Sequence, residues 1–408
     1  MQATQLNLFS AVLHAYGDSA NGQLSNAEVY AKVANTLELT EEESQVRVTI
    51  SGESRNALAQ RVRWYQQTLK KAGILEHVEG ERAVWGLTQK ASKDLSKVEP
   101  NVAVVGFSTE LGVAILGTCE HVFSHIDAPI TLVLTSPPYP LRQTRAYGNP
   151  PEHLYVDWVC QTLEPLVKNL VPGGSICLNI SNDIFLPQSP ARSLYVERLI
   201  IALHDRLGLF LMDRLPWVNR SKPPGPIQYA SIQRNQLNVA WEPLYWLTND
   251  PKRVRADNRR VLQQHSQRHL DLSHSGGEKR DVSNSDGAYV IRPGAYGAET
   301  AGSIPKNVLF YGHRCAAQLA YKKAARALGL PVHGAPMPLK LAMFLIEFLS
   351  EPGDIIADPF SGSFTTADAA EQLGRQWIAT ECMLQYVLGG GTRFVDRPGY
   401  RQHLRLAA

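Results

Sequence analysis

Between residues 100 and 215, short apolar runs alternate with longer stretches that have the apolar spacing of helices. The apolar runs lie at residues 102–105, 113–116, 130–134 and 176–180. The clearest helix-length stretch is 154–170, and Val171-Pro172-Gly173-Gly174 should end it. Because strands that alternate with helices pair mainly in parallel, this region predicts an α/β unit with a largely parallel sheet.

The first 95 residues have a helical pattern of their own. Ser25 and Glu28 have the spacing of a capping box, and Val29, Val33 and Leu37 follow on one helical face. This pattern predicts a helix that begins just after Ser25.

A second helix is expected from Ser54 to Gly73, since glycine commonly ends helices. It has an apolar stripe and a basic face, formed by Leu58, Val62, Tyr65 and Leu69 and by Arg55, Arg61, Arg63, Lys70 and Lys71. A short hairpin with its turn at residues 79–81 should follow. Helices followed by a hairpin favour a winged-helix-like domain over residues 1–95 that binds DNA or mediates dimerisation. A helical domain that binds a protein partner, with a solvated basic face, is the alternative.

The apolar run at 130–134 ends in Thr135-Ser136-Pro137-Pro138-Tyr139. Two consecutive prolines cannot donate to a strand ladder, so the strand should stop there. Ligands of open α/β sheets bind at the carboxyl ends of strands. This rigid loop is therefore a candidate site.

A second strand end lies far downstream, in residues 353–366. An apolar strand ends at Asp358, a loop of small residues leads into a helix at 365–373, and a further strand at 377–379 ends at Glu381. An acid about 20 residues beyond such a loop is placed to hold ribose hydroxyls. The G-x-G-x-x-G pattern of dinucleotide sites is absent, since only Gly362 is present. The loop therefore suits a nucleoside without a pyrophosphate, such as S-adenosylmethionine.

Residues 216–310 interrupt the alternation. Prolines and glycine crowd residues 220–226, and lysines and arginines outnumber acids between 252 and 280. Long polar loops in a compact domain are either functional or disordered. We therefore expect this region to bind a polyanion, with plain disorder as the alternative.

Composition limits the class of protein. The chain has 408 residues, 44% hydrophobic and 19% charged, which is typical of a globular protein with two or three domains. No window approaches 18 apolar residues and the first residues lack a basic signal region, so we expect a cytoplasmic protein with no membrane partner. The five cysteines are scattered without C-x-x-C spacing, which predicts reduced thiols and no metal site. A net charge of +3 requires any DNA-binding charge to be local.

The two strand-end motifs together resemble the β class of DNA amino methyltransferases, over about residues 100–395. In that family a Ser/Asp/Asn-Pro-Pro-aromatic motif precedes a motif of the type Asp-Pro-Phe-x-Gly-Ser-Gly-Thr-Thr, and here the second motif begins at Asp358. Residues 333–339 resemble the segment before the cofactor strand, and 238–247 weakly resemble the segment that holds the target base. Phe364 stands where the family usually has glycine. Gly334 and Pro336 depart from the family's common His-Pro-Ala-x-Phe-Pro sequence. The N-terminal region is similar to that of Mrr-type restriction proteins.

The resemblance implies a Rossmann-like methyltransferase sheet with helices on both faces. Its catalytic part would be residues 100–215, its cofactor part 311–395, and its inserted, loop-rich target-recognition region 216–310, with a tail at 396–408. It implies S-adenosylmethionine as cofactor and double-stranded DNA as partner, with a possible homodimer, a possible separate restriction endonuclease, and activity at the bacterial nucleoid.

Site residues follow from the same resemblance. The catalytic set is Ser136, Pro137, Pro138 and Tyr139. The cofactor set is Thr135, Pro338, Asp358, Pro359, Phe360, Ser361, Gly362, Ser363, Thr365, Thr366 and Glu381. The expected DNA contacts are Arg142, Arg145, Arg220, Lys222, Arg234, Arg253, Arg255, Arg259 and Arg260. His333 is a weaker candidate, because a structural histidine explains it equally well.

The chemistry explains the catalytic motif. An exocyclic amine becomes nucleophilic when acceptors hold its N–H groups, and Ser136 Oγ and the Pro137 carbonyl can supply them. Tyr139 would stack on a base that has left the duplex. No cysteine follows a proline, which argues against a cytosine C5 enzyme with an attacking thiolate. In the family that the chain resembles, serine in this motif favours cytosine N4, whereas aspartate or asparagine favours adenine N6. Both amines satisfy the same hydrogen-bond geometry, so adenine N6 stays an alternative.

Two other functions are kept as alternatives. One is a DNA-binding regulator that no longer turns over, with Phe364 obstructing the cofactor. The other is a methyltransferase that acts on RNA or on protein amides.

Overall fold

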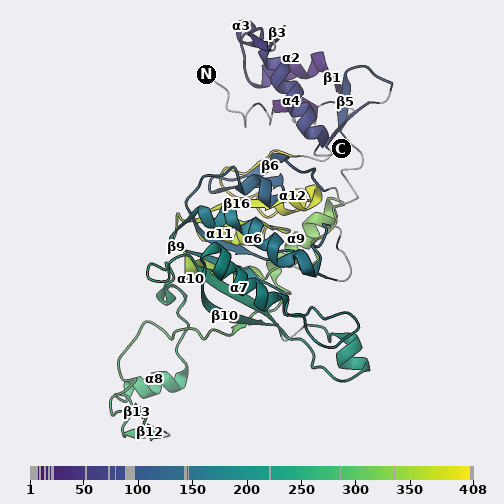
Figure 1. Cartoon of the computed structure of the whole chain (residues 1–408). Coiled ribbons are helices and arrows are strands. Elements are labelled where there is room, and N and C mark those ends of the chain that lie inside the picture. The colour runs from purple at the N-terminus through teal and green to yellow at the C-terminus, as the bar shows by residue number, and fades with distance from the viewer. Residues whose placement is uncertain are drawn as a thin grey trace.

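The largest element of the fold is one ten-stranded mixed sheet with helices on both faces (Figure 1). The computed structural model describes residues 8, 11–12, 15–16, 19, 23–50, 53–71, 74–78, 80–87, 97–141, 145, 147–219, 222–284, 286–334 and 336–404. The strand order is β14-β10-β11-β9-β8-β15-β16-β7-β6-β17. The strands are β6 (Ala103–Ser108), β7 (Gly112–Gly117), β8 (Ile130–Thr135), β9 (Leu170–Asn179), β10 (Phe210–Val218), β11 (Trp241–Thr248), β14 (Leu309–Phe310), β15 (Ile355–Asp358), β16 (Gln376–Glu381) and β17 (Arg401–Gln402).

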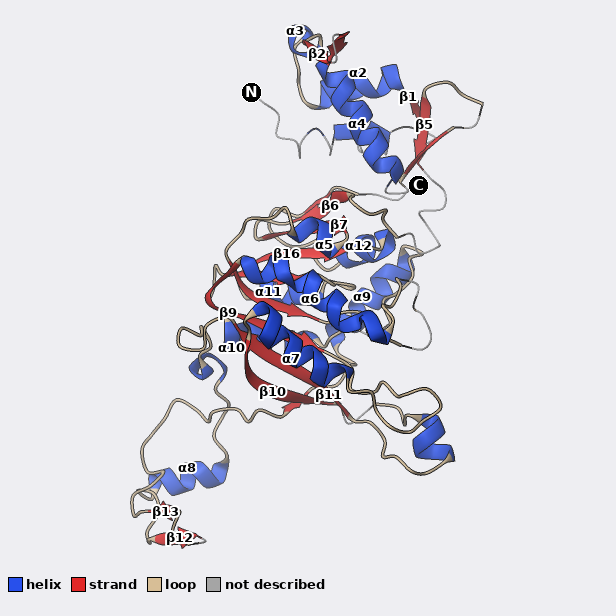
Figure 2. Ribbon diagram, in the orientation of Figure 1, coloured by secondary structure: helices blue, strands red, loops and turns tan. Residues whose placement is uncertain are grey.

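Two clusters of buried apolar side chains fill the two faces of this sheet. One cluster is built on α5 (Cys119–Phe123), α6 (Glu152–Lys168) and α7 (Tyr195–Leu207). The other is built on α9 (Ala316–Ala327), α10 (Leu339–Leu349), α11 (Thr365–Gln372) and α12 (Leu384–Gly391). Figure 2 shows helices over the strands in this arrangement. The predicted Rossmann-like α/β fold is confirmed.

The centre of the sheet is parallel and its flanks are mixed, since β14 pairs with β10 in parallel while the other flanking pairs are antiparallel. Strands β9, β8, β15, β16 and β7 pair in parallel, so their carboxyl ends share one edge. The pair β6 and β7 is an antiparallel hairpin, because its connection, residues 109–111, is too short for a crossover helix. Strand β11 is antiparallel to both β9 and β10. The largely parallel sheet predicted from residues 100–215 is therefore confirmed at the centre, and the antiparallel pairs at the flanks were not predicted.

The segment 171–174 lies inside a strand rather than between elements. Helix α6 ends at Lys168, and β9 begins at Leu170. Gly173 has φ +78°, and a Cβ on it would stand 1.8 Å from the carbonyl oxygen of Arg253. Only glycine fits this position, so the Pro-Gly-Gly sequence marks a close backbone approach and not a loop.

Residues 216–310 contribute strands to the main sheet. Strand β10 runs across the boundary expected at 215 and 216, and β11 and β14 also belong to the sheet. Two projections leave it (Figure 2). One carries the π-helix η2 (Ile227–Ile232). The other carries α8 (Gln267–His274), β12 (Val282–Asn284) and β13 (Tyr289–Ile291), and it follows η3 (Asn258–Val261), which packs against α10.

The described part of the N-terminal region forms its own small sheet, with the order β1-β5-β4, and a separate β2-β3 hairpin, together with helices. Its elements are β1 (Gln23–Ser25), α2 (Asn26–Thr36), α3 (Glu41–Ser44), β2 (Arg47–Ile50), β3 (Glu53–Asn56), α4 (Ala57–Lys71), β4 (Leu75–His77) and β5 (Val84–Leu87). The predicted capping box is present, with Ser25 N donating to Glu28 Oε2 at 2.7 Å. Helix α4 begins three residues later than predicted, because residues 53–56 form β3. The winged-helix assignment stays a prediction.

No helix in the described part of the chain is long and apolar enough to span a membrane.

Candidate active site

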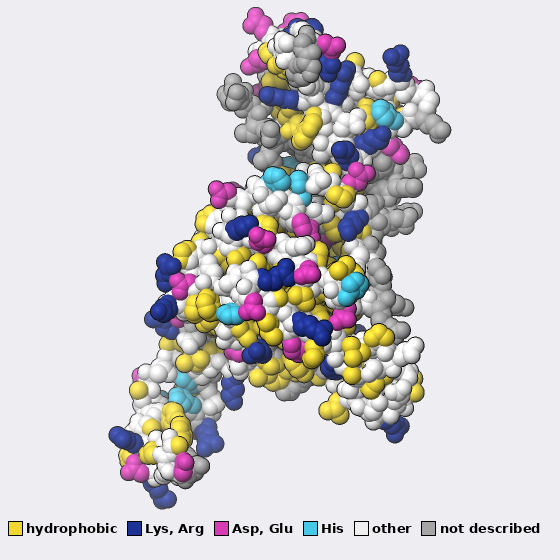
Figure 3. Space-filling model, in the orientation of Figure 1, with side chains coloured by type: hydrophobic (Ala, Val, Ile, Leu, Met, Phe, Trp, Pro, Cys, Tyr) yellow, Lys and Arg dark blue, Asp and Glu magenta, His cyan; other side chains and the backbone are white. Residues whose placement is uncertain are grey.

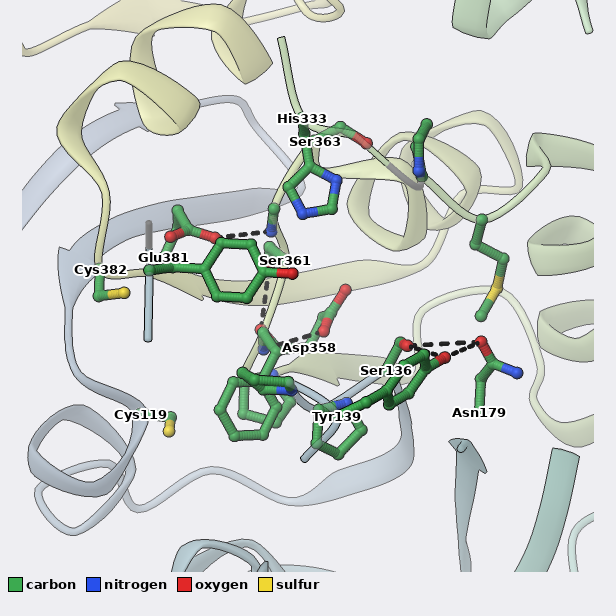
Figure 4. A pocket seen from close by; sticks show the side chains of 18 of the residues that line it. Cys119, Ser136, Tyr139, Asn179, His333, Asp358, Ser361, Ser363, Glu381 and Cys382 are labelled. Carbon is green, nitrogen blue, oxygen red and sulfur yellow. Dashed lines mark hydrogen bonds between the residues drawn. The ribbon is translucent and has the colours of Figure 1, made fainter. Parts of the chain in front are cut away.

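A cavity of about 650 Å³ lies at the carboxyl edge of the parallel strands (Figure 4). Strands β8 and β15 are neighbours, so the loop after Thr135 and the loop after Asp358 open into the same space. Strand β16 lies beside β15 and brings Glu381 to the same cavity. Residues more than 200 positions apart in the chain thus line one site.

The hydroxyl groups of Ser136 and Tyr139 meet at the side chain of Asn179. Tyr139 Oη donates to Asn179 Oδ1 at 2.9 Å, Ser136 Oγ to the same oxygen at 3.4 Å, and the two hydroxyls lie 3.0 Å apart (Figure 4). Asn179 Nδ2 donates to the carbonyl of Pro243 at 3.3 Å, which fixes the amide orientation. Burial raises the pKa of Tyr139 well above its ordinary value, so this hydroxyl stays protonated.

Sequence reasoning missed Asn179. It is the last residue of β9, it is buried, and it follows an apolar run. A polar residue at the carboxyl end of a buried strand was the available signal, but only the pairing of β9 with β8 brings it beside Ser136.

Asp358 ends β15 and is buried at the centre of the cavity wall. Its Oδ1 accepts from Thr135 Oγ1 at 2.7 Å and from the backbone N–H of Phe360 at 3.1 Å. Burial raises the pKa of Asp358 to about 6, and these hydrogen bonds work in the opposite direction. Thr135 thus ties the catalytic strand to the second motif.

Glu381 ends β16 and has both carboxylate oxygens occupied by backbone donors. Gly362 N donates to Oε2 and Met383 N to Oε1, each at 2.8 Å. Burial raises the pKa of Glu381 to about 7, against the effect of these two donors. Glu381 lines the cavity, and a carboxylate has about four acceptor positions, more than these two donors use.

Gly362 and His333 form a close contact over the same loop. Gly362 has φ +50°, and a Cβ there would stand 2.9 Å from His333 Nε2. His333 also stacks on Tyr147, with ring centroids 6.1 Å apart. Its Nδ1 is buried without a hydrogen-bond partner in the described part of the chain, and burial lowers the pKa of His333 to about 4. A neutral imidazole with an unused nitrogen therefore lines the cavity.

Phe364 points away from this cavity. It caps α11 with a left-handed backbone, φ +59°, and its fully buried ring packs 5.1 Å from that of Phe107. The ring lies against Gly390 of α12, where a Cβ would stand 2.2 Å from Phe364 Cδ2. Phe364 is not among the cavity residues, so it does not obstruct the site.

Comparison with known proteins identifies the family. A family described as DNA methylase matches residues 130–389, and the Mrr N-terminal domain matches residues 7–97. The chain belongs to the DNA methylase family. It is an S-adenosylmethionine-dependent DNA amino methyltransferase with an Mrr-type N-terminal domain.

Individual relatives support this assignment. The Type II methyltransferase M.PvuII of Proteus hauseri is 32% identical to this DNA methylase over 301 residues, which are 71% of this chain and 85% of the relative. M.BglII of Bacillus subtilis is 23% identical over 261 residues, 64% of this chain and 62% of the relative. The solved structure of PvuII DNA methyltransferase (cytosine-N4-specific) matches with a TM-score of 0.55 and 28% identity, over 71% of this chain and 88% of that chain.

The cavity of the DNA methylase fits its cofactor. Its volume lies in the usual range for small-molecule sites. Glu381 offers carboxylate acceptors for ribose hydroxyls, the rings of Trp158 and Phe360, 5.3 Å apart, offer apolar walls, and His333 Nδ1 offers an unused polar atom. The residues present therefore suit a nucleoside with a polar tail.

Most residues predicted for the site line this cavity. They are Ser136, Pro137, Pro138, Tyr139, Asp358, Pro359, Phe360, Ser361, Gly362, Ser363, Thr365, Thr366 and Glu381. Two of the predicted residues do not line it. Thr135 holds Asp358 from behind, and Pro338 caps α10 while its neighbours Pro336 and Met337 line the cavity. Glu242, from the segment expected to hold the target base, also lines the cavity. Lining residues that sequence reasoning did not place here include Lys97, Cys119, Trp158, Trp217 and His313.

The predicted DNA contacts separate into three groups. Arg142 and Arg220 lie outside the described residues. Arg145 and Arg234 are exposed, and Lys222 lines the cavity in an ion pair with Glu242, Nζ to Oε1 2.9 Å.

The third group, Arg253, Arg255, Arg259 and Arg260, pairs with acids of the protein itself. Arg255 and Arg260 bind Asp354 and Glu351, just before β15. Arg253 and Arg259 pair with Asp250 and Asp257. Because Asp354 precedes β15, the first two arginines lie at the amino edge of the sheet, opposite the cavity. Their geometry supports a structural role rather than DNA contact.

Proposed function

We propose that this DNA methylase transfers the methyl group of S-adenosylmethionine to N4 of a cytosine that has flipped out of duplex DNA. The observation that carries this proposal is that Ser136, with its hydroxyl directed by Asn179, lies in one cavity with Asp358 and Glu381. The serine in the catalytic motif and the similarity to a cytosine-N4-specific enzyme support cytosine as the base.

Asn179 makes Ser136 an acceptor. A serine hydroxyl has one proton and two acceptor lone pairs. Asn179 Oδ1 and Tyr139 Oη engage that proton, so the lone pairs of Ser136 are free for an N–H of the target amine. With the carbonyl of Pro137 as second acceptor, the amine nitrogen is drawn toward a pyramidal, nucleophilic geometry.

The second motif would hold the cofactor, which supplies the transferable methyl group on its sulfonium. Glu381 would accept from the ribose hydroxyls, Phe360 would contact the adenine, and the backbone of residues 358–366 would shape the pocket. Holding the amine and the cofactor in one cavity converts an encounter of two molecules into a positioned reaction.

The position of the catalytic motif supports a base that leaves the duplex. Tyr139 is half-buried and Asn179 is buried, both in the wall of the cavity, and a base stacked within a duplex does not extend into such a cavity. We therefore propose base flipping, with Tyr139 packing against the extruded base.

Mass spectrometry of nucleosides tests the proposal. Phage λ DNA grown in a host without DNA methylases is incubated with the enzyme and S-adenosylmethionine, and N4-methylcytosine is expected. N6-methyladenine would contradict the choice of base only. Methyl transfer to RNA or protein but not to DNA would contradict the proposed substrate. Ser136→Ala should abolish the product while cofactor binding persists.

The regulator alternative predicts no cofactor binding. Its basis was obstruction by Phe364, and this side chain lies in the core between β6 and α12. Calorimetric titration that shows no binding at millimolar S-adenosylmethionine would restore that alternative.

For partners, we propose duplex DNA, a homodimer and a separately encoded restriction endonuclease. The similarity to enzymes named as Type II methyltransferases supports the last.

A further inference from the structure

Lys97 connects the N-terminal domain to the cofactor end of the active-site cavity. It is the last residue of the region that matches the Mrr N-terminal domain, and it precedes the catalytic region predicted to begin at residue 100. Although Lys97 is exposed, it lines the cavity together with Glu381 and Cys382. A residue that ends the N-terminal domain in the sequence thus contributes to the rim of the methyltransferase site.

The backbone of Lys97 and of its neighbour Val98 is held against the segment that follows Glu381. Lys97 forms an antiparallel β-bridge with Met383, and the N–H of Val98 donates to the carbonyl of Cys382 at 2.8 Å. The side chain of Val98 is 3% exposed and belongs to the buried core. The backbone of Lys97 is therefore anchored beside Met383, whose own N–H donates to the carboxylate of Glu381.

The ammonium group of Lys97 reaches across the rim of the cavity. Its Nζ lies 3.4 Å from the carbonyl oxygen of Tyr147, and a Cβ on Gly148 would stand 3.8 Å from it. Tyr147 and Gly148 line the cavity as well, from the loop that follows the catalytic motif. An ammonium has three N–H donors and no acceptor, and the carbonyl uses one of the three. No acid among the described residues lies within ion-pair distance of Lys97, so two donors are available to a ligand.

The order of the strands decides which part of the cofactor lies near Lys97. Asn179 and Ser136 follow β9 and β8, where the methyl acceptor is proposed to lie, and Glu381 ends β16. Lys97 pairs with the segment after β16, which β15 separates from the strand of Ser136. The sulfonium must point toward the acceptor, and the ribose is proposed to lie at Glu381. The part of the cofactor nearest to Lys97 is therefore its adenosine.

We propose that Lys97 donates a hydrogen bond to the adenosine of S-adenosylmethionine, and that the bound cofactor thereby fixes the segment that joins the two domains. This inference rests on the proposed function, which places the ribose at Glu381. Adenosine is neutral, and its ring nitrogens and ribose oxygens can accept from an ammonium. The sulfonium is positive, so an ammonium beside it would be repelled. The position of Lys97 away from Ser136 avoids this repulsion.

Lys97→Met tests the contact, because it removes the ammonium and keeps an unbranched side chain and the backbone bridge. Lys168→Met is the matched control. Lys168 ends α6 just before β9 begins, at the amino edge of the sheet, and its side chain is 70% exposed. Calorimetry measures the affinity of each protein for S-adenosylmethionine and for S-adenosylhomocysteine, which lacks the sulfonium charge. Thermal unfolding measures whether either substitution changes stability.

We expect Lys97→Met to weaken the binding of both ligands about 5- to 50-fold and by the same factor, because both contain the adenosine. Lys168→Met should stay within about twofold of the natural protein. The unfolding temperature should not change in either variant, since the backbone bridge of Lys97 does not need its side chain. In hydrogen-exchange mass spectrometry, saturating S-adenosylmethionine should slow exchange in peptides that contain Val98, and should do so less in Lys97→Met.

Three results would overturn the proposal. Equal affinities of Lys97→Met and the natural protein would remove Lys97 from the cofactor. A gain in affinity for S-adenosylmethionine but not for S-adenosylhomocysteine would place Lys97 beside the sulfonium instead. Exchange at Val98 that the cofactor leaves unchanged would show that the joining segment is not fixed. In all three cases the natural protein still binds the cofactor and the proposed function stands, whereas a natural protein that binds neither ligand would refute both.

Discussion

At the scale of single residues, the direction in which Ser136 donates its proton decides whether its hydroxyl can accept a hydrogen bond from the substrate amine. Its hydroxyl lies within hydrogen-bonding distance of Tyr139 Oη and Asn179 Oδ1. Asn179 cannot turn its amide around, because Nδ2 already donates to Pro243 O. The serine proton therefore points into the protein and a lone pair is left for the substrate. Asn179 is a positioning residue in this account, since it acts through Ser136.

Replacing Asn179 separates positioning from packing. Asn179→Leu removes the acceptor and keeps the branched shape of the side chain, and it should lower kcat about 100-fold, with KM for DNA and cofactor affinity within about twofold. Asn179→Asp keeps an acceptor oxygen and should retain more activity than the leucine variant. Steady-state kinetics check both. An aspartate variant no better than the leucine variant would refute the role of the acceptor.

Glu381 predicts a pH dependence of cofactor binding. Ribose hydroxyls donate to the ionised carboxylate, and burial raises the pKa of Glu381 to about 7. The dissociation constant should therefore be constant above pH 8 and rise about tenfold between pH 8 and pH 6, because the protonated acid must first lose its proton. Calorimetry of the natural protein and Glu381→Gln checks this. The glutamine variant should bind more weakly and without this slope; an equal slope in both would assign the titration to another group.

At the scale of elements, strands were predictable where apolar runs end at polar loops, and pairing was not. The run at 130–134 and the strand ending at Asp358 occur as predicted, as β8 and β15. The antiparallel β6–β7 hairpin was missed, because a run of apolar residues contains no information about its partner. The packing partner of Phe364 could not be predicted from the local sequence either. Its backbone uses the conformation that favours the family's glycine, and its ring is accommodated by a glycine on another helix, Gly390.

The packing of α11 on α12 predicts coupling between Phe364 and Gly390. Gly390→Ala should destabilise the fold by about 1–3 kcal/mol, because the new methyl group collides with the ring. Phe364→Gly should destabilise it by about 3–5 kcal/mol through the cavity left near Phe107. The double variant should cost less than the two losses together by about 1 kcal/mol or more. Urea unfolding of the four proteins measures this, and simple additivity would show that the two residues do not compete for space.

At the scale of the whole molecule, the two edges of the central sheet differ in kind. The carboxyl edge gathers Ser136, Asp358 and Glu381 in one cavity. The amino edge gathers arginines that bind acids of the protein, with Arg260 donating to Glu351 at 2.6 Å and to the carbonyls of Arg255 and Ser350. The basic composition of residues 252–280 could not show that Arg255 and Arg260 bind acids of the protein, since composition counts charges and not their partners.

This difference between the two edges predicts that a substitution at the amino edge affects stability and not activity. Arg260→Ala should lower stability by about 1–2 kcal/mol, through the loss of two partly buried hydrogen bonds to carbonyls and one exposed hydrogen bond to Glu351. It should leave kcat/KM for DNA within about twofold. Thermal unfolding and tritium transfer check the two halves of this prediction. A large loss of kcat/KM at unchanged stability would return Arg260 to the DNA interface.

The sequence by itself determined the class of fold, the two motifs and the cofactor, because strand periodicity, paired prolines and an acid after a small-residue loop are local properties of a chain. It could not determine which side chains meet. The pairing of the strands places Asn179 beside Ser136 and the Phe364 ring in the core. It also places Arg255 and Arg260 beside acids of the protein, and Lys222 and Glu242 in the cavity wall. Contacts between distant segments depend on strand order and register, and these arise from packing the whole chain at once.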